Sequence, residues 1–193
     1  MIGLLMTGAV SLVAGQPLAA APFKAAPHTR QMTDLDTAPG HFSVWTAQDL
    51  DGINAIRLRF RINAVAKDPD KKWAPIFRFQ LKRGDQVVQL SLTGFAGKTP
   101  LLLQFQQVSG RTTTSDEQIP ALMQVGELAD LAIDWSADGK ASFLLKSADP
   151  SSPIAQGRVY TGQLAGSPSE FTILGSTGEI EVQSIELGTS TGG

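Results

Sequence analysis

The sequence contains no cysteine, which excludes disulfides, thiolate catalysis and cysteine-ligated metals. Histidine occurs only as His28 and His41, and neither has a sequence neighbour that would complete a catalytic or metal-binding pair. Tyrosine occurs once, at Tyr160. A mechanism based on histidine or cysteine therefore has almost no residues available, and any function must depend on other side chains.

The sequence also lacks a strong excess of either charge, with 16 Lys and Arg against 18 Asp and Glu and a formal net charge of −2. No global field would recruit nucleic acid, so we expect no nucleic-acid partner. The charge is unevenly distributed, however, because residues 57–83 hold nine Lys or Arg against only Asp68 and Asp70. This local basic region is a more informative clue than the total charge.

Long apolar runs are absent except at the N-terminus, where residues 1–21 carry no charge. The run from Met1 to Ala14 leads into small residues, which resembles a secretory signal peptide with cleavage near residues 15–21, although no basic residue precedes it. Gly and Pro interrupt the run before the about 20 apolar residues that the alternative, an uncleaved membrane anchor, requires. We therefore expect a periplasmic or secreted protein with no membrane span after signal cleavage.

The remaining chain divides by pattern into three parts. Residues 22–40 are rich in Pro, Ala and Thr without a period, and we interpret them as a linker or an N-terminal edge. Residues 41–188 show repeated apolar–polar alternation, which is typical of half-buried strands. Residues 189–193 are predicted to be a frayed tail. About ten short strands and no long helical pattern predict an all-β, antiparallel two-sheet β-sandwich.

Residues 131–145 give the clearest hairpin signal. Two short apolar segments flank an Asp-Gly pair, in which Gly139 can adopt the positive φ that closes a tight turn. The side chains predicted to face the core are Leu131, Ile133, Trp135, Ala141, Phe143 and Leu145. Elsewhere, residues 109–120 are expected to form a polar loop. A change of apolar parity along the last strand predicts a β-bulge at residues 183–184.

Three segments, residues 131–145, 171–175 and 178–187, together resemble the concanavalin A-like lectin/glucanase superfamily, which includes laminin G-like domains. The resemblance covers about residues 40–188. It implies a jelly roll whose concave face or loop rim commonly holds a glycan, sometimes with calcium. A fold this widely reused does not assign a function by itself.

Alternating arginines supply the main candidate binding residues. Arg57, Arg59 and Arg61 project from one side of one predicted strand, opposite its apolar residues. If the strand at 76–82 lies nearby, the same polar face gains Arg78, Gln80 and Lys82, widened by Gln89, Ser91, Gln104 and Gln106. Guanidinium groups bind carboxylates and glutamines bind sugar hydroxyls, so this face suits an acidic polysaccharide. The alternative is an ordinary solvated face.

Two further groups have alternative interpretations. Trp73 is either a lid over the core or a platform on which a sugar stacks. Asp134, Ser136 and Asp138 follow the alternating spacing of calcium loops but lack the distal bidentate glutamate. Calcium is therefore possible, also at other loop carboxylates (Asp49, Asp51, Asp68 and Asp70), but no metal ligand is assigned.

Catalytic candidates come only from the resemblance. Family 16 glycoside hydrolases carry a Glu-x-Asp-x-Glu or Glu-x-Asp-x-x-Glu motif, to which Glu179 and Glu181 are similar, but the third acid is replaced by Gln183 or Ser184. Polysaccharide lyases of this fold use a tyrosine base, which would be Tyr160. We expect a non-catalytic domain that binds a polysaccharide or another cell-envelope component. A lyase or hydrolase, and a structural envelope domain without a ligand, are the alternatives.

Overall fold

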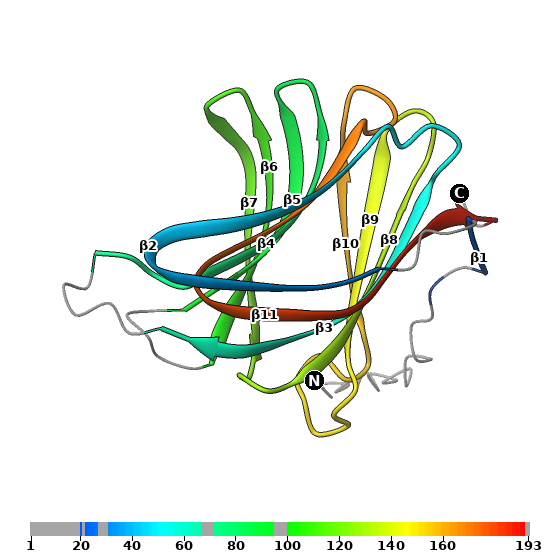
Figure 1. Cartoon of the computed structure of the whole chain (residues 1–193). Helices are drawn as coiled ribbons and strands as arrows, with labels where there is room; N and C mark the ends of the chain where they lie inside the picture. Colours follow the sequence, from blue (N-terminus) through cyan, green and yellow to red (C-terminus); the bar gives the residue numbers. More distant parts are fainter. Residues whose placement is uncertain (1–19, 21, 27–30, 67–71, 95–99, 192–193) are drawn as a thin grey trace, which may run out of the picture.

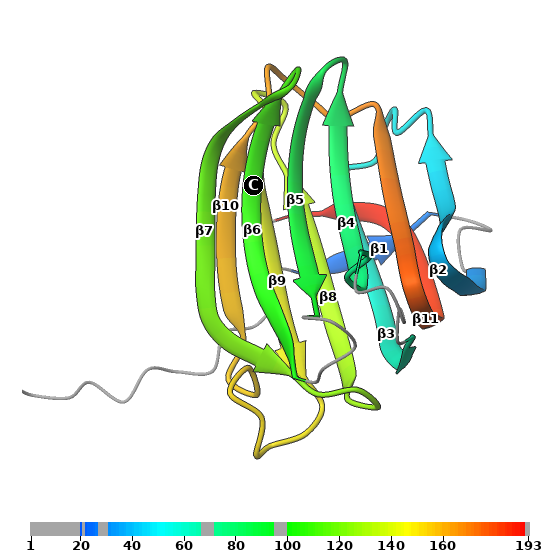
Figure 2. The ribbon, with the colours of Figure 1, turned by 90° about the vertical axis from the view of Figure 1, so that its left-hand side faces the viewer.

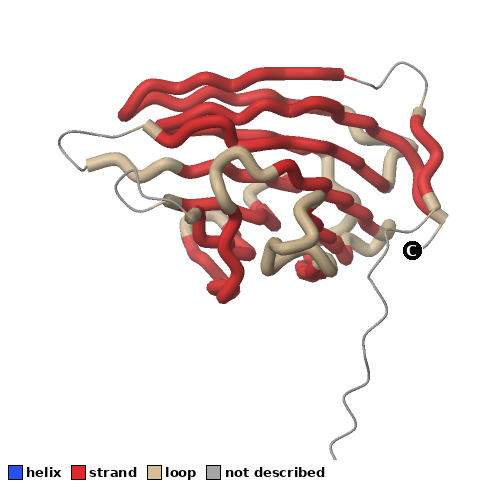
Figure 3. Tube along the Cα trace, turned by 90° about the horizontal axis from the view of Figure 1, so that it is seen from below, coloured by secondary structure: helices blue, strands red, loops and turns tan. Residues whose placement is uncertain are grey.

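The computed structural model describes residues 20, 22–26, 31–66, 72–94 and 100–191. Within these ranges the regular secondary structure consists of β-strands alone, as Figure 3 shows. None of these residues forms a helix with the length and apolarity needed to cross a membrane. The all-β fold predicted from the alternating sequence is therefore confirmed. The signal-peptide prediction falls on residues 1–19 and 21, outside the described part of the chain.

Eleven strands follow one another along the described chain. They are β1 (Phe23–Ala25), β2 (Gln31–Gln48), β3 (Ala55–Val65), β4 (Ile76–Arg83), β5 (Gln86–Thr93), β6 (Leu101–Ser109), β7 (Thr112–Met123), β8 (Leu128–Trp135), β9 (Lys140–Ser147), β10 (Arg158–Gln163) and β11 (Glu170–Ser190). Their hydrogen-bonded order is β10-β9-β8-β3-β11-β4-β5-β6-β7, with β1 and β2 also paired to β11.

The strands form two antiparallel layers, which lie one behind the other in Figure 2. The front sheet contains β2, β11, β4, β5, β6 and β7, and the back sheet contains β2, β11, β3, β8, β9, β10 and the short β1. This is the two-sheet jelly-roll sandwich that the sequence predicted, and its two outward faces are the surfaces on which a ligand site would lie.

Two strands, β2 and β11, belong to both layers. Residues 170–176 of β11 pair with β4, whereas residues 178–188 pair with β3. Figure 1 shows both ribbons turning back at the same side of the molecule. Gly178 permits the turn in β11, because a Cβ there would lie 2.5 Å from the Ala64 carbonyl oxygen and 2.8 Å from the Phe77 ring. Only glycine fits this close approach of backbone to its neighbours.

One hydrophobic core fills the space between the layers. Alternate residues of β3 and β4 are fully or almost fully buried, and the Phe60 and Phe79 rings meet across the layers with centroids 4.6 Å apart. The 131–145 hairpin is confirmed as β8 and β9, with Leu131 opposite Leu145, Ile133 opposite Phe143 and Trp135 opposite Ala141. All six of these side chains are buried. The sequence therefore predicted the register of this hairpin correctly.

The structure distinguishes the two interpretations that the sequence left open for the N-terminal segment. Residues 31–40 are an N-terminal edge rather than a linker, because they form the first half of β2, which lies along β11. Leu35 and Thr37 are buried there, while their neighbours Asp34 and Asp36 are exposed. An edge strand in which polar residues occupy most positions carries too little apolar alternation to be recognised from sequence.

The predicted loop at residues 109–120 and the predicted tail at residues 189–193 are wrong in part, whereas the predicted β-bulge is confirmed. Residues 112–117, predicted as loop, belong to β7, which pairs only with β6 and is exposed on both faces there, so no alternation marks it. The tail prediction is wrong for residues 189–190, because β11 continues to Ser190, which pairs with Phe23. The predicted bulge is present, since the register of β11 against β3 shifts between Val182 and Ser184.

Candidate functional site

The three arginines of β3 face outward from the back sheet, as their parity predicted. The acidic partners come from the strands on either side. The ion pairs are Arg57–Asp134 at 2.8 Å, Arg59–Asp130 at 2.7 Å and Arg61–Glu181 at 2.8 Å. The row is therefore neutralised by carboxylates that lie far away in the sequence, and it presents no excess positive charge to a polyanion.

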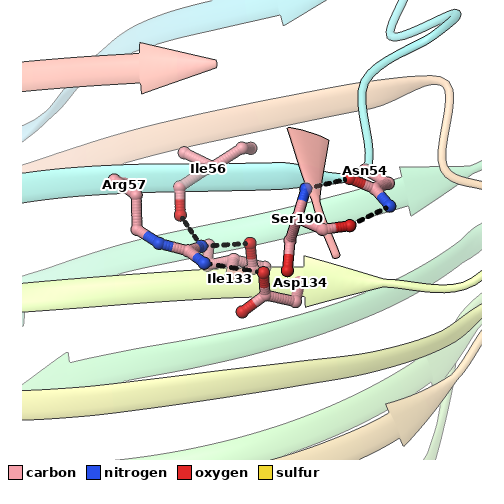
Figure 4. Close-up of polar contacts among 6 residues, drawn as sticks. All are labelled: Asn54, Ile56, Arg57, Ile133, Asp134 and Ser190. Atoms are coloured by element: carbon pink, nitrogen blue, oxygen red, sulfur yellow. Dashed lines mark hydrogen bonds and ion pairs between the residues drawn. The ribbon is translucent and has the colours of Figure 1, made fainter. Parts of the chain in front are cut away.

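Arg57 is the most enclosed member of this row, with 17% of its side chain exposed. Its guanidinium donates to the carbonyl oxygens of Ile56 and Ile133 as well as to the Asp134 carboxylate (Figure 4). It also lies 4.8 Å from the centre of the Phe23 ring of β1. These contacts tie β1, β3 and β8 together, which is a structural role rather than an open binding position.

The structure does not bring the two predicted halves of the basic face together. Arg78, Gln80 and Lys82 alternate with the buried Phe77, Phe79 and Leu81 of β4, so they face outward from the front sheet. The arginine row of β3 faces outward from the back sheet, on the other side of the core. The prediction that these residues extend one polar face is wrong, because β11 lies between β3 and β4 where the chain changes layer.

The outward face of the front sheet does bring the predicted glutamines together. Gln80 of β4 donates to Gln89 of β5, and Gln89 donates to Gln106 of β6, both at 2.6 Å. Gln104 donates to Asp116 of β7 at 2.8 Å. Gln89 is only 5% exposed, so it orders the half-buried Gln80 and Gln106 on either side of it. Gln104 and Asp116 form a separate pair at the β6–β7 edge. The face therefore holds fixed amide donors and acceptors.

Lys82 and Arg78 differ in their charge balance. Lys82 lies 2.7 Å from Glu170 of β11, and this contact, with a hydrogen bond from Thr172, lowers the pKa of the Glu170 carboxyl. Arg78 lies opposite Ser91 of β5 and has no ion pair or hydrogen bond to any described residue, while burial lowers the pKa of its guanidinium. The Ser91 hydroxyl is buried and also without a partner. Arg78 is thus an uncompensated cation recessed in a polar face.

Exposed apolar residues flank this polar face on the side of β2. Phe42 is 70% exposed and Val44 is 45% exposed. Val44 lies beside Leu174 of β11, which in turn lies beside Arg78. Sequence reasoning did not single out these residues. The available signal was the alternation around Trp45, whose ring packs against Phe171 in the core and so directs its neighbours outward.

Trp73 is not a lid over the core, because it is 54% exposed and lies outside the core cluster. Its indole is placed against Gly40 of β2, where a Cβ would lie 3.1 Å from the ring nitrogen. Trp73 therefore adds an aromatic surface beside the same strand that carries Phe42 and Val44. Its use as a stacking platform for a sugar stays a prediction.

Tyr160 lies in the core, where its ring stacks on Phe105 with centroids 5.6 Å apart. Burial raises the pKa of its hydroxyl to about 12, against a smaller opposite effect of the nearby Arg158. By distance and angle the hydroxyl has no hydrogen-bond partner among the described residues. A general base needs a pKa near the working pH and contact with the substrate. The position and the raised pKa both oppose the role of a lyase base.

We expect Tyr160→Phe to leave the stability unchanged or to raise it by about 1 kcal/mol. The substitution removes a buried hydroxyl that has no partner and keeps the ring contact with Phe105. Urea denaturation followed by far-UV circular dichroism measures the difference in free energy of unfolding. A loss of more than about 1 kcal/mol would show that the hydroxyl has a partner in the native state.

The two glutamates that are similar to the hydrolase motif lie on the back sheet. Glu181 pairs with Arg61, which lowers the pKa of its carboxyl, with smaller contributions from Gln183 and Asn63. Glu179 accepts a hydrogen bond of 2.7 Å from Asn63. Neither residue shares a face with Arg78 or with the buried Tyr160. The catalytic candidates thus lie in two separate environments, the outward face of the back sheet and the core, and they do not form one catalytic constellation.

The side chains with the calcium-like spacing at residues 134–138 are engaged in an ion pair and in hydrogen bonds within the turn. Asp134 pairs with Arg57, and Asp138 accepts hydrogen bonds from Ser136 and from the Lys140 backbone within the turn. Across the described residues there is no group of three or more His, Cys, Asp or Glu side chains placed to hold a metal ion. Of the other loop carboxylates, Asp68 and Asp70 lie outside the described ranges.

The architecture defines a jelly-roll β-sandwich of the kind found in lectins. No protein-family model matches the chain, and no curated protein matches it. Among solved structures it is similar to the galectin LEC-6 of Caenorhabditis elegans, with a TM-score of 0.50, 10% identity and coverage of 86% of this chain and 100% of that one. It is also similar to CG-16, a homodimeric agglutinin from chicken liver, with a TM-score of 0.52, 11% identity and coverage of 75% and 99%.

These identities show the fold alone. The likeness supports the jelly-roll part of the resemblance read from the sequence, whereas membership of the concanavalin A-like superfamily stays a resemblance. The two structures are described as a galectin and as an agglutinin, and what they bind is a property of those proteins.

Proposed function

We propose that this protein is a non-catalytic glycan-binding domain and that its site is the outward face of the front sheet. The proposal is supported by the lectin-like fold and by a face that combines fixed glutamines with exposed apolar residues. Sugars offer hydroxyl groups around an apolar ring face, so a face that carries both ordered amides and exposed apolar side chains suits them. We further propose that the glycan is acidic, because Arg78 needs an anionic partner.

The unpaired Arg78 is the observation that carries this proposal. A recessed guanidinium without a carboxylate costs stability, since it is partly desolvated and its Nε has no acceptor. A uronate carboxylate would accept two parallel hydrogen bonds from it and supply the missing charge. The other basic side chains of the predicted polar face already have carboxylate partners; these are Arg57, Arg59, Arg61 and Lys82.

The test compares retention of the protein on immobilised polygalacturonate with retention on a neutral glucan, and repeats the comparison with Arg78→Met. We expect stronger retention of the wild type on the uronate polymer, weakening as salt is raised. Arg78→Met should lower the affinity for uronate about tenfold or more, as expected for a charge-assisted pair. The free energy of unfolding of this variant should rise by about 1 kcal/mol, because an unpaired polar group is replaced by an apolar one of similar length.

Arg59→Ala is the matched control. It removes an arginine from the opposite face, where Asp130 neutralises it and about half of the side chain is exposed. The control should retain the wild-type affinity for uronate. The proposal is wrong if the wild type prefers the neutral glucan, or if the two variants lose affinity equally.

A further inference from the structure

A second polar pocket lies on the other layer, at the end of the β8–β9 hairpin. It has a volume of about 250 Å³, and its polar lining comes from Asp134, Ser136, Lys140, Ser142 and Thr161, with Asn54 and Ser190 at one side. This is smaller than the roughly 300–1,000 Å³ of sites for drug-sized ligands, and it suits a molecule of the size of one sugar ring. The front-sheet site does not account for it, and of the sequence patterns that indicate a ligand only the calcium-like spacing includes two of its residues, Asp134 and Ser136.

The polar groups of the pocket are arranged by strand register. Asp134 of β8 lies directly opposite Ser142 of β9, and Ser142 lies directly opposite Thr161 of β10. Opposite side chains have Cβ atoms about 4.5–5.5 Å apart, so the three form a row of oxygen atoms on the scale of a pyranose ring. Lys140 precedes Ser142 by two residues on β9 and therefore lies on the same face.

One wall of the pocket is held rigidly. Asn54 donates to the Ser190 carbonyl oxygen at 3.2 Å and accepts from the Ser190 backbone N–H at 2.7 Å, as Figure 4 shows. The Trp135 backbone N–H donates to the Asn54 carbonyl oxygen at 3.0 Å. These bonds join the ends of β8 and β11 to the start of β3. A wall fixed in this way lowers the cost of ordering a bound ligand.

The other wall carries polar groups that are available to bind a ligand. Among the described residues, the Lys140 ammonium and the Ser142 and Thr161 hydroxyls make no hydrogen bond or ion pair. Only one of the two Asp134 oxygens is engaged, by Arg57 at 2.8 Å. The pocket therefore presents a donor, an acceptor and two hydroxyls that can serve as either.

We propose that this pocket binds one residue of a neutral sugar. Hydroxyl groups both donate and accept, so a single ring can satisfy Lys140 and the free oxygen of Asp134 at the same time. The free Asp134 oxygen would repel a carboxylate group on the ligand. Arg57 neutralises the charge of Asp134, so the pair has no net negative charge that would attract a cation. The inference goes beyond the proposed function, because the pocket lies on a different layer and takes a different sugar class from the front-sheet site.

The experiment is an NMR titration of isotope-labelled full-length protein with glucose, galactose and mannose. We expect at least one hexose to shift the backbone amides of Ser136, Ala141, Ser142 and Thr161 in a saturable way, with a millimolar Kd. Lys140→Met should weaken this binding at least fivefold. Lys146→Met, a matched exposed lysine on the same strand and face but outside the pocket, should leave the Kd unchanged.

Further arms separate this site from its alternatives. Arg78→Met should not alter the hexose shifts, so failure of the front-sheet proposal and failure of this one are distinguishable. The inference is overturned by any of three results: no saturable shift up to about 100 mM hexose, tighter binding of glucuronate than of every hexose at these amides, or tighter binding of glycine, which would indicate a zwitterion site.

Discussion

Gly139→Ala is expected to destabilise the protein by about 3–5 kcal/mol. Gly139 closes the β8–β9 hairpin with a φ of +89°, a conformation that L side chains rarely adopt. A Cβ at this position would lie 2.3 Å from the Leu164 carbonyl oxygen and 2.6 Å from backbone atoms of Gly166. Backbone cannot rotate away as a flexible side chain can, and the Leu164 N–H bond to the Gly139 carbonyl oxygen would be disturbed as well.

The matched control for this substitution is Gly126→Ala. Gly126 has a similar φ of +86°, but nothing lies within 4 Å of a Cβ built there. It should therefore lose only the conformational part, about 1–2 kcal/mol. Equilibrium urea denaturation of the two variants isolates the steric part as the difference between them. Equal losses would mean that the segment at 164–166 does not pack against the turn.

Trp135→Ala is expected to cost about 3–5 kcal/mol of unfolding free energy. The side chain is only 3% exposed and belongs to the central hydrophobic cluster, so truncation removes a large buried surface and leaves a cavity. The residue ends β8 in register with Ala141, and a small neighbour cannot refill the space.

Trp73→Ala is the control for the tryptophan truncation. Because its ring is about half exposed and outside the core, it should cost less than about 1 kcal/mol. Far-UV circular dichroism gives both unfolding curves without depending on tryptophan fluorescence. An unfolding midpoint of Trp135→Ala within error of the wild type would show that the ring is not part of the core.

Local sequence signals were sufficient for the parts of the fold that bury one face of a strand. Alternation located β3, β4 and the β8–β9 hairpin because one wrong register would expose a whole apolar set. Alternation could not predict β7 or the first half of β2. Their side chains are mostly polar or exposed, so these edge strands are specified by pairing with neighbours rather than by their own pattern.

The candidate site was harder to predict, because a cluster of basic residues in the sequence can be neutralised by acidic residues that are distant in the sequence but close in the fold. Residues 57–83 carry nine basic side chains, yet the row of arginines on β3 meets carboxylates contributed by β8 and β11. Sequence periodicity gave the direction of each side chain but not its partners. It also could not reveal that β3 and β4 lie in different layers, since that depends on where β11 inserts between them.

The position of β11 has a consequence for how this chain must fold. It lies between β3 and β4, and it comes after every other described strand in chain order. Neither layer can close until the segment at 170–190 is available, so early-formed hairpins are left with unpaired edges. Such long-range pairing is slow and leaves strand edges open to aggregation. Once inserted, the same strand links both layers into one cooperative unit, in which neither sheet can open without disturbing the other.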